Sequence, residues 1–337
     1  MNDQNPTAVT PPQGGGQLPS DIPLALDATA VDVAFRGSNG RWSSVVTHVG
    51  LGLERGQVTV LLGESGSGKT VFARSITGMA PTGARVQGRV DFDGVDLLRM
   101  SRRELRGIQG KRIGMVPQDP NASLDPMRRI GGQIIETLRR HRPELDREAA
   151  NARMLELLDL VQIREPERVA RCYPHEVSGG MRQRVAIAIA ISCDPELIVA
   201  DEPSSALDAS VGVRVVELLS ELRERLGTAI LLITHDIGIA ALVASKPHDR
   251  VAVMLSGRIV ELGFAHIVLS DARHPYTRAL IAAEPSASVP RGHLAVVPDS
   301  VREQRRWGEL VAVAPGHGVA APLDEHGATI DSEAGAA

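Results

Sequence analysis

An eight-residue glycine-rich stretch, GESGSGKT at 63–70, constrains the fold of this chain more than any other feature. It follows an apolar run at 58–62 and precedes a segment at 71–79 whose residues favour a helix. The glycines allow positive φ and a close backbone approach to an anion, and a following helix directs free N–H groups to the same point. An ordinary glycine turn needs neither the flanking elements nor the Lys-Thr ending. The stretch therefore predicts a binding loop for a nucleoside triphosphate.

Each residue of this loop is a candidate contact for the triphosphate. The loop consists of Gly63, Glu64, Ser65, Gly66, Ser67, Gly68, Lys69 and Thr70. The Lys69 ammonium is expected to pair with the β- and γ-phosphates, and the Thr70 hydroxyl is expected to coordinate Mg²⁺. ATP with Mg²⁺ is thus the expected ligand.

The composition argues against a nucleic-acid partner. The chain of 337 residues has a formal net charge of -4, and only 2% of its residues are aromatic. Nucleic-acid binding depends on basic surfaces and, for single strands, on aromatic stacking. The two cysteines, Cys172 and Cys193, predict a reducing compartment, and they favour small buried hydrophobes over a disulfide framework or a metal cluster.

The composition of both ends of the chain predicts poor order. Residues 1–26 have the composition of a disordered leader without a signal peptide, and 286–337 is expected to be weakly structured or disordered. The longest apolar stretch, at 229–244, carries His235 and Asp236 at its centre, and a membrane span needs about 20 uninterrupted apolar residues. We therefore expect a soluble chain that reaches a membrane only through a partner.

The central part has the pattern of an α/β sheet. Alternation across 30–62 predicts β-strands that lead into the phosphate loop. Short uninterrupted apolar runs predict strands buried on both faces; they lie at 197–200, 229–233 and 251–255. Helical patterns, such as that at 213–226, separate these runs. This order favours a parallel sheet covered by helices.

Polar residues follow several of these predicted strands. Asp201 ends one strand and is suited to hold Mg²⁺ through water. The adjacent Glu202 is suited to accept a proton from an attacking water. His235, after the next strand, is a candidate donor to the γ-phosphate, and Gln118 is a candidate to orient water or bind Mg²⁺. Each residue alone is weak evidence, since a histidine at a strand end is often a structural polar residue.

A second anion-binding turn is expected at Ser178, Gly179 and Gly180, in VSGGMRQR at 177–184. This turn predicts a helix over 185–191, although that segment alternates with a period of two. A chain with one phosphate loop has little need of a second anion site. The turn is therefore expected to close over the nucleotide of a partner in a head-to-tail dimer; an ordinary helix cap is the alternative.

Together, these motifs resemble those of ATP-binding-cassette (ABC) ATPases. The Walker A motif is at 63–70, the Q-loop at Gln118, the signature motif at 178–182, the Walker B motif at 197–201 with Glu202, the D-loop at 205–208 and the H-loop at His235. The resemblance covers about residues 30–285. It implies an α/β P-loop NTPase with a RecA-like mixed sheet core, an antiparallel β subdomain and an inserted α-helical subdomain at about 119–190. The ABC ATPase domain would span 27–262.

The resemblance also implies roles for single residues. Thr70, Gln118 and Asp201 would serve Mg²⁺, Glu202 would be the catalytic base and His235 the γ-phosphate sensor. Further contacts would come from the signature residues, from a residue that links the two sites of the dimer, and from an aromatic on adenine. These are Ser178, Gly179, Gly180 and Met181 for the signature, Asp208 for the link, and Trp42, with Phe35 as the alternative, for the aromatic.

A narrower resemblance involves HPYTRALIAAEP at 274–285, in the segment 263–285 that follows the ATPase domain. With Met181 in the signature, it is similar to the ATPase subunits of oligopeptide, dipeptide and nickel importers. His274 and Tyr276 are expected to start and pack a helix and are assigned no catalytic role. Relatives often carry a cysteine-rich tail that holds an iron–sulfur cluster, but 286–337 contains no cysteine, which argues against one here.

The narrower resemblance implies an ATPase that energises uptake of peptides or nickel from the cytoplasmic face of the cell membrane. Its expected partners are integral membrane permease subunits, an identical or related second ATPase and, indirectly, an extracytoplasmic solute-binding protein. A soluble ABC protein of translation or repair is one alternative, although such proteins often pair two cassettes in one chain. The ATPase of an exporter is the other.

Overall fold

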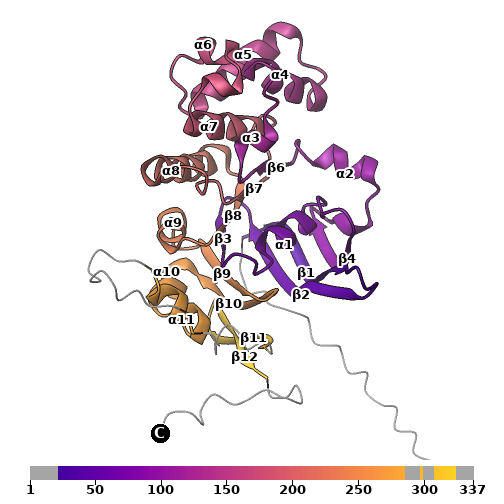
Figure 1. The fold of residues 1–337 in the computed structure, drawn as a ribbon, viewed down its shortest axis with the longest axis vertical. Helices are drawn as coiled ribbons and strands as arrows, with labels where there is room; N and C mark the ends of the chain where they lie inside the picture. Colours follow the sequence, from indigo (N-terminus) through magenta and orange to yellow (C-terminus); the bar gives the residue numbers. More distant parts are fainter. Residues whose placement is uncertain (1–21, 285–296, 299–306, 324–337) are drawn as a thin grey trace, which may run out of the picture.

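The computed structural model describes residues 22–284, 297–298 and 307–323 (Figure 1). Within them, two sheets carry the fold: a four-stranded sheet in the order β2-β1-β4-β5 and an eight-stranded sheet in the order β11-β12-β10-β9-β3-β8-β7-β6. A group of helices stands at one end of the larger sheet, and the four-stranded sheet lies beside its middle (Figure 1). This is the mixed α/β architecture expected from the sequence.

The four-stranded sheet is antiparallel. It contains β1 (Leu24–Arg36), β2 (Trp42–Glu54), β4 (Ala84–Phe92) and the short β5 (Val95–Asp96). Buried side chains alternate with partly exposed ones along much of β1, and β2 is exposed at its start and largely buried toward its end. The strand β1 begins at Leu24, so the predicted disordered leader is wrong for its last three residues. Residues 1–21 lie outside the described part.

The larger sheet has a parallel centre. It contains β3 (Val58–Leu62), β6 (Ile113–Val116), β7 (Leu197–Asp201), β8 (Ala229–Thr234) and β9 (Arg250–Leu255), which pair in parallel. Almost every side chain of these strands is buried, because helices and the smaller sheet cover both faces. The antiparallel β10 (Arg258–Phe264) continues the sheet beyond β9. It runs past residue 262, where the ATPase domain was predicted to end.

The helices fall into two groups along the chain. Those that surround the sheets are α1 (Lys69–Ile76), η1 (Leu97–Arg99), α2 (Arg102–Ile108), α8 (Ala209–Leu226), α9 (Ile237–Val243), α10 (Ala265–Ser270) and α11 (Pro275–Ala282). Those between β6 and β7 are α3 (Pro120–Ser123), α4 (Ile130–His141), α5 (Arg147–Leu160), α6 (Pro166–Arg171), η2 (Pro174–Glu176) and α7 (Gly179–Ala190). The second group occupies the predicted insert and forms the upper end of the molecule in Figure 1.

Helix α7 confirms that 185–190 is helical despite its period of two, and the last predicted residue, Ile191, is its C-cap. The Ser178 hydroxyl accepts a hydrogen bond from the Met181 N–H and caps the helix. Val185, Ala186, Ile187, Ala188 and Ala190 are all buried. The helix lies between other helices and the sheet, so its apolar residues need not follow one face. The alternation of small and large residues is compatible with close helix packing.

The C-terminal region differs from its prediction. The strands β11 (Trp307–Ala314) and β12 (His317–Pro322) form a hairpin, and β12 joins the large sheet beside β10. The prediction of a weakly structured tail is therefore wrong for 307–322, and the rest of the tail is described only at 297–298 and 323. The turn between the two strands places Gly316 at φ 71, a backbone angle that glycine adopts easily. Glycine content, which favoured disorder in the sequence analysis, here allows a tight hairpin.

Two further features of the described residues bear on function. None of their helices is both long and apolar enough to cross a bilayer. Cys172 and Cys193 are free thiols, the second of them buried.

Candidate nucleotide-binding and hydrolysis site

The Walker A loop joins β3 to α1 at the edge of the sheet where the parallel strands end. Gly63 begins it at φ 152, and a Cβ there would lie 2.3 Å from the Met254 carbonyl oxygen of β9. Gly68, at φ 102, is the N-cap of α1. The first glycine lets the loop pass β9 closely, and the last turns the chain into a helix whose free N–H groups face the loop.

Lys69 is folded back onto its own loop. Its ammonium donates to the carbonyl oxygens of Gly63, at 2.6 Å, and Glu64, at 2.8 Å. Burial lowers the pKa of Lys69, while the negative charges of Glu202 and Asp201 oppose that shift. Nearby, the buried Ser67 hydroxyl has no hydrogen-bond partner within the described residues. A buried cation and an unused hydroxyl in one glycine-rich loop fit a phosphate ligand.

Thr70 and Asp201 meet across the ends of α1 and β7. The Thr70 hydroxyl donates to Asp201 Oδ1 at 2.8 Å, although the two residues are 131 positions apart. Burial raises the pKa of the Asp201 carboxyl, and the Thr70 hydrogen bond opposes the shift. A hydroxyl and a carboxylate held together beside a phosphate loop are hard oxygen ligands of the kind that Mg²⁺ prefers.

The Glu202 carboxylate contacts the other two predicted catalytic residues. Its Oε1 lies 3.1 Å from His235 Nδ1, and its Oε2 accepts a hydrogen bond from Gln118 Nε2 at 3.3 Å. The Glu202 backbone stands at φ 44, and its N–H donates to the Ile233 carbonyl of β8. The carboxylate side chain is 16% exposed and the His235 side chain 56% exposed. Three strands thus deliver a carboxylate, an imidazole and an amide to one partly open point.

The signature turn lies elsewhere on the chain. Ser178, Gly180 and Met181 line a hollow of about 840 Å³, together with Arg184, Arg214 and residues of α5 and α6. Within the described part, no Walker A residue lines this hollow. The hollow beside the signature turn is therefore distinct from the Walker A loop of the same chain.

The structure gives Asp208 a local role. Its carboxylate caps α8 by accepting from the Ser210 hydroxyl at 2.8 Å and from the Val211 N–H at 3.0 Å. The Ser210 bond, followed by the Val211 bond, lowers the pKa of Asp208. A link between two sites of a dimer stays a prediction.

The two candidates for adenine stacking differ in exposure. Trp42, the first residue of β2, is 49% exposed, and the Arg85 guanidinium lies 5.9 Å from its ring centroid. Phe35 is only partly exposed and packs against the hydrophobic cluster between the sheets. Trp42 therefore offers more free ring surface. The contact with adenine stays a prediction for both residues.

One contact with the Walker A loop is not predicted from the sequence. The Tyr276 hydroxyl, on α11, accepts a hydrogen bond from the Glu64 N–H at 3.1 Å. The expected packing role is also present, since His274 caps α11 by accepting from the Tyr276 N–H. A spacing of 212 residues leaves no local pattern from which the contact with Glu64 follows.

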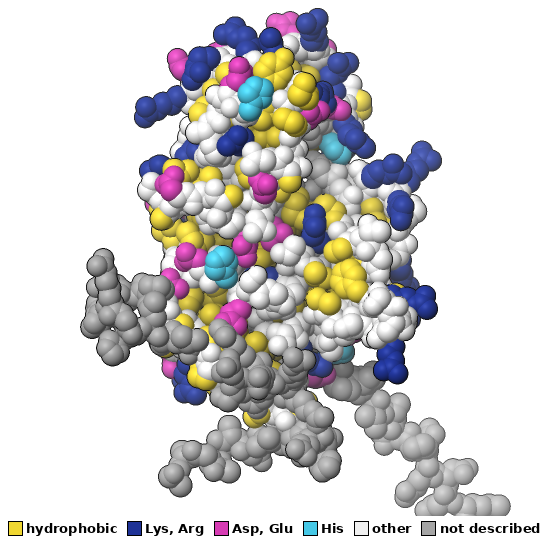
Figure 2. All heavy atoms as spheres, in the orientation of Figure 1, with side chains coloured by type: hydrophobic (Ala, Val, Ile, Leu, Met, Phe, Trp, Pro, Cys, Tyr) yellow, Lys and Arg dark blue, Asp and Glu magenta, His cyan; other side chains and the backbone are white. Residues whose placement is uncertain are grey.

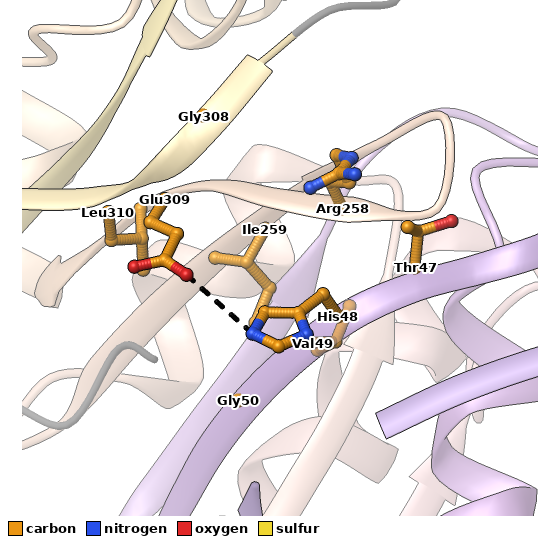
Figure 3. A pocket seen from close by; sticks show the side chains of 9 residues that line it. All are labelled: Thr47, His48, Val49, Gly50, Arg258, Ile259, Gly308, Glu309 and Leu310. Carbon is orange, nitrogen blue, oxygen red and sulfur yellow. Dashed lines mark ion pairs between the residues drawn. The ribbon is translucent and has the colours of Figure 1, made fainter. Parts of the chain in front are cut away.

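A small hollow separates the C-terminal hairpin from β2 (Figure 3). His48 of β2 and Glu309 of β11 face each other across it, with 3.7 Å between Nε2 and Oε1. Its volume is about 30 Å³, enough for about one water molecule. It includes none of the predicted site residues, so we interpret it as the seam where the hairpin rests on the smaller sheet.

Comparisons with known proteins agree with this geometry. The ABC transporter family matches residues 46–205. The oligopeptide transport ATP-binding protein OppD of Bacillus subtilis (strain 168) is 41% identical over 263 residues, which cover 77% of this chain and 72% of that protein. The probable D,D-dipeptide transport ATP-binding protein DdpD of Escherichia coli (strain K12) is 41% identical over 278 residues, covering 82% of this chain and 83% of that protein.

Solved structures give the same result for the fold. The ATP-binding cassette MJ0796, solved as a dimer bound to ADP and Pi in a post-hydrolysis state, superposes with a TM-score of 0.61 at 29% identity. The match covers 69% of this chain and 96% of that chain. A Walker A loop, a Walker B carboxylate pair and a separate signature turn are thus carried on a fold shared with nucleotide-binding cassettes. The chain belongs to the ABC transporter family and is the ATP-hydrolysing subunit of a transporter.

Proposed function

We propose that this chain energises the uptake of peptides by an ABC importer, through membrane subunits that are separate chains. The observation that carries the proposal is the convergence of Gln118 and His235 on Glu202, beside the Thr70–Asp201 pair. The names of both relatives support peptides as the cargo. The HPYT segment that starts α11 supports the same subgroup.

The nucleotide site would be assembled from the Walker A loop and the strand ends. Lys69 and the loop amides would bind the phosphates of ATP, while Thr70, Asp201 and Gln118 would hold Mg²⁺. When bound, Mg²⁺ supplies positive charge that offsets the charge of the phosphate oxygens. Lys69 already has two carbonyl partners, so its ammonium would exchange one or both of them for phosphate oxygens. Trp42 would stack on the adenine.

Hydrolysis would depend on the three residues that meet at Glu202. The Glu202 carboxylate would accept a proton from the attacking water at Oε1 or Oε2. Gln118 and His235 hold these two oxygens at 3.3 and 3.1 Å, which fixes the direction of the carboxylate. His235, whose side chain is 56% exposed, would also reach the γ-phosphate. General-base catalysis of this kind contributes about 10²–10⁴ in rate.

A second ATPase subunit, identical or related, would complete each site. Within one chain the hollow at the signature turn includes no Walker A residue, so the N–H groups of the turn would meet the nucleotide of the partner. Arg184 and Arg214 line the same hollow and would add positive charge. Asp208 would link the two sites. The dimeric cassette MJ0796, bound to ADP and Pi, supports this arrangement.

The membrane subunits would bind the helical end of the molecule, at the cytoplasmic face of the cell membrane. Lys and Arg side chains gather around that end and around α2 (Figure 2). A hollow of about 370 Å³ lies between α2 and α4, lined among others by Arg106, Arg140 and Glu136. It would offer the permease subunits a polar docking surface. An extracytoplasmic solute-binding protein would act on the complex indirectly, and no nucleic acid is needed.

Reconstitution of the complete transporter tests this proposal. Purification of the chain with candidate permease subunits should give a membrane complex whose ATPase rate rises with a peptide-loaded solute-binding protein. Stimulation by Ni²⁺ with no response to peptides would overturn the cargo. Failure to associate with any membrane subunit, combined with binding to ribosomes or DNA, would overturn the transport role.

A further inference from the structure

Helix α11 reaches the Walker A loop through the side chain of Tyr276. Tyr276 is fully buried, and its hydroxyl oxygen accepts a hydrogen bond from the backbone N–H of Glu64 at 3.1 Å. The ring comes from the C-terminal segment, whereas Glu64 is the second residue of the phosphate loop. A residue outside all the nucleotide motifs thus touches the backbone of the site.

The hydrogen bond acts on the same peptide unit that holds Lys69. The Gly63 carbonyl and the Glu64 N–H belong to one peptide bond, which is planar and directs the two groups to opposite sides. On the carbonyl side, Lys69 Nζ lies at 2.6 Å, and on the N–H side the Tyr276 hydroxyl lies at 3.1 Å. Rotation of this plane would move both contacts. Tyr276 therefore restrains the carbonyl that positions the Lys69 ammonium.

This peptide needs an external restraint because it follows a glycine. Gly63 has the widest choice of backbone angles, so the plane after it is weakly fixed by the chain itself. Other parts of the loop are held from outside too: the Gly257 N–H donates to the Ser67 carbonyl at 2.9 Å. The β9–β10 turn restrains the end of the loop, and Tyr276 restrains its beginning.

Tyr276 is itself held by buried polar groups. His274 accepts from the Tyr276 N–H at 3.1 Å, and the Glu261 carboxylate of β10 accepts from the backbone N–H groups of Arg273 and His274. The C-terminal hairpin closes this cluster: His317 Nε2 lies 2.8 Å from Glu261 Oε1, and the Trp307 ring packs 4.1 Å from His274, centroid to centroid. These contacts fix the position of the first residues of α11, and with them the backbone of Tyr276.

We propose that Tyr276 is a positioning residue of the nucleotide site, acting through the Gly63–Glu64 peptide on Lys69. Its hydroxyl holds the peptide plane in the orientation that keeps the ammonium ready for the phosphates. The inference rests on the proposed role of Lys69 as a phosphate ligand. It assigns no chemical step to Tyr276.

The first test compares two substitutions that each remove one buried hydroxyl from α11. Tyr276→Phe deletes the contact with Glu64, whereas Thr277→Val deletes a hydroxyl that has no hydrogen-bond partner among the described residues. Equilibrium titration of the full chain with MgATP should give a Kd about fivefold higher for Tyr276→Phe, the loss expected for one hydrogen bond. Thr277→Val should bind like the unmodified chain. Equal Kd values for Tyr276→Phe and the unmodified chain would overturn the proposal.

A double-mutant cycle separates positioning from a purely structural role. In a Lys69→Ala background, Tyr276→Phe should raise the Kd by less than about twofold, because the ammonium that it positions is gone. A full fivefold loss in both backgrounds would show that Tyr276 acts without Lys69 and would overturn the proposal. If Lys69→Ala binds MgATP as tightly as the unmodified chain, the proposed phosphate site fails instead.

Two further measurements cover other outcomes. Tyr276→Phe in the complete transporter should raise the KM for ATP while kcat stays within about twofold, because the residues at Glu202 are untouched. If Tyr276→Phe does not fold, amide hydrogen exchange at Glu64 in the unmodified, nucleotide-free chain decides. Slow exchange supports the restraint on this peptide, and exchange at the rate of an open loop overturns it.

Discussion

The two anion-binding turns of this chain, the Walker A loop and the signature turn, are built in opposite ways. The Walker A loop is held from several sides, by β9, by the β9–β10 turn and by α11, and its lysine is buried. In the signature turn, the Met181 N–H donates to the Ser178 hydroxyl and the Arg182 N–H donates to the Ser178 carbonyl, and Ser178 is exposed. One turn is complete within the fold, and the other is presented to the outside.

This difference indicates that the Walker A loop works in the single chain and that the signature turn works only in a dimer. A loop restrained by its own chain can bind a nucleotide before any partner arrives. An exposed turn with free N–H groups gains its ligand only when another molecule brings one. The single chain is therefore expected to bind MgATP and to hydrolyse it slowly, and a pair of chains to hydrolyse it fast.

The largest effect is expected from Glu202→Gln. The amide keeps the shape of the side chain but cannot accept a proton from water, so ATP turnover by the dimer should fall by about 10² or more. The Kd for MgATP of the single chain should stay within about twofold. Steady-state ATPase assays and equilibrium titration measure the two quantities. Glu217→Gln, an exposed carboxylate on α8, is the matched control; near-normal turnover of Glu202→Gln would refute the assignment of the base.

Alanine in place of a glycine should separate the two turns by stability. In Gly63→Ala the new Cβ would lie 2.3 Å from a backbone oxygen, at a φ that disfavours alanine, so the free energy of unfolding should fall by about 2–3 kcal/mol. In Gly179→Ala the Cβ would meet only the ends of two side chains, Leu207 at 3.6 Å and Arg182 at 3.9 Å. Its stability and MgATP affinity as a single chain should therefore be unchanged, while dimer turnover falls. Urea unfolding measures the first effect, and equal destabilisation by both substitutions would contradict the comparison.

The sequence predicts the parts of the site that depend on strand ends. Parallel strands end at one edge of their sheet, so Asp201, Glu202 and His235 were expected near the loop that follows β3. The structure brings Thr70 to Asp201 and His235 to Glu202 as the motif order indicates. No such rule connects Tyr276 with Glu64, since their contact depends on how α11 packs. The hairpin of β11 and β12 was missed because its glycines and alanines are typical of loops as well as of a tight β-turn.

A moderate, pH-dependent effect is expected behind the Walker A loop, at His274. Burial, with a smaller effect of Arg278, lowers the pKa of His274 to about 4, whereas the unfolded chain keeps an ordinary value near 6.5. Between these values the unfolded chain binds the proton and the folded chain does not, so stability is present above pH 6.5 and is lost as the pH falls. From pH 7.5 to 5.5 this residue should cost about 1 kcal/mol.

The measurement for His274 is the difference between two unfolding curves. His274→Asn keeps a side-chain acceptor for the Tyr276 N–H but cannot titrate. Its free energy of unfolding should therefore fall about 1 kcal/mol less than that of the unmodified chain between pH 7.5 and 5.5. Parallel pH dependences for the two proteins would refute a buried neutral histidine. The same pH change should leave the exposed signature turn unaffected, because its cap contains no titratable group.

The smallest effect on the single chain is expected from the hydroxyl of the signature turn. Ser178→Ala removes one long, exposed capping bond of 3.3 Å, so the stability of the chain should fall by about 0.5–1 kcal/mol and its MgATP affinity should not change. Thr70→Val removes the corresponding hydroxyl of the Walker A loop, which bonds Asp201 at 2.8 Å, and should weaken MgATP binding by the single chain. Titration of both variants, as single chains, compares the turns directly. Weaker MgATP binding by Ser178→Ala would mean that the signature turn reaches the nucleotide of its own chain, and the assignment of that turn to a partner would fall.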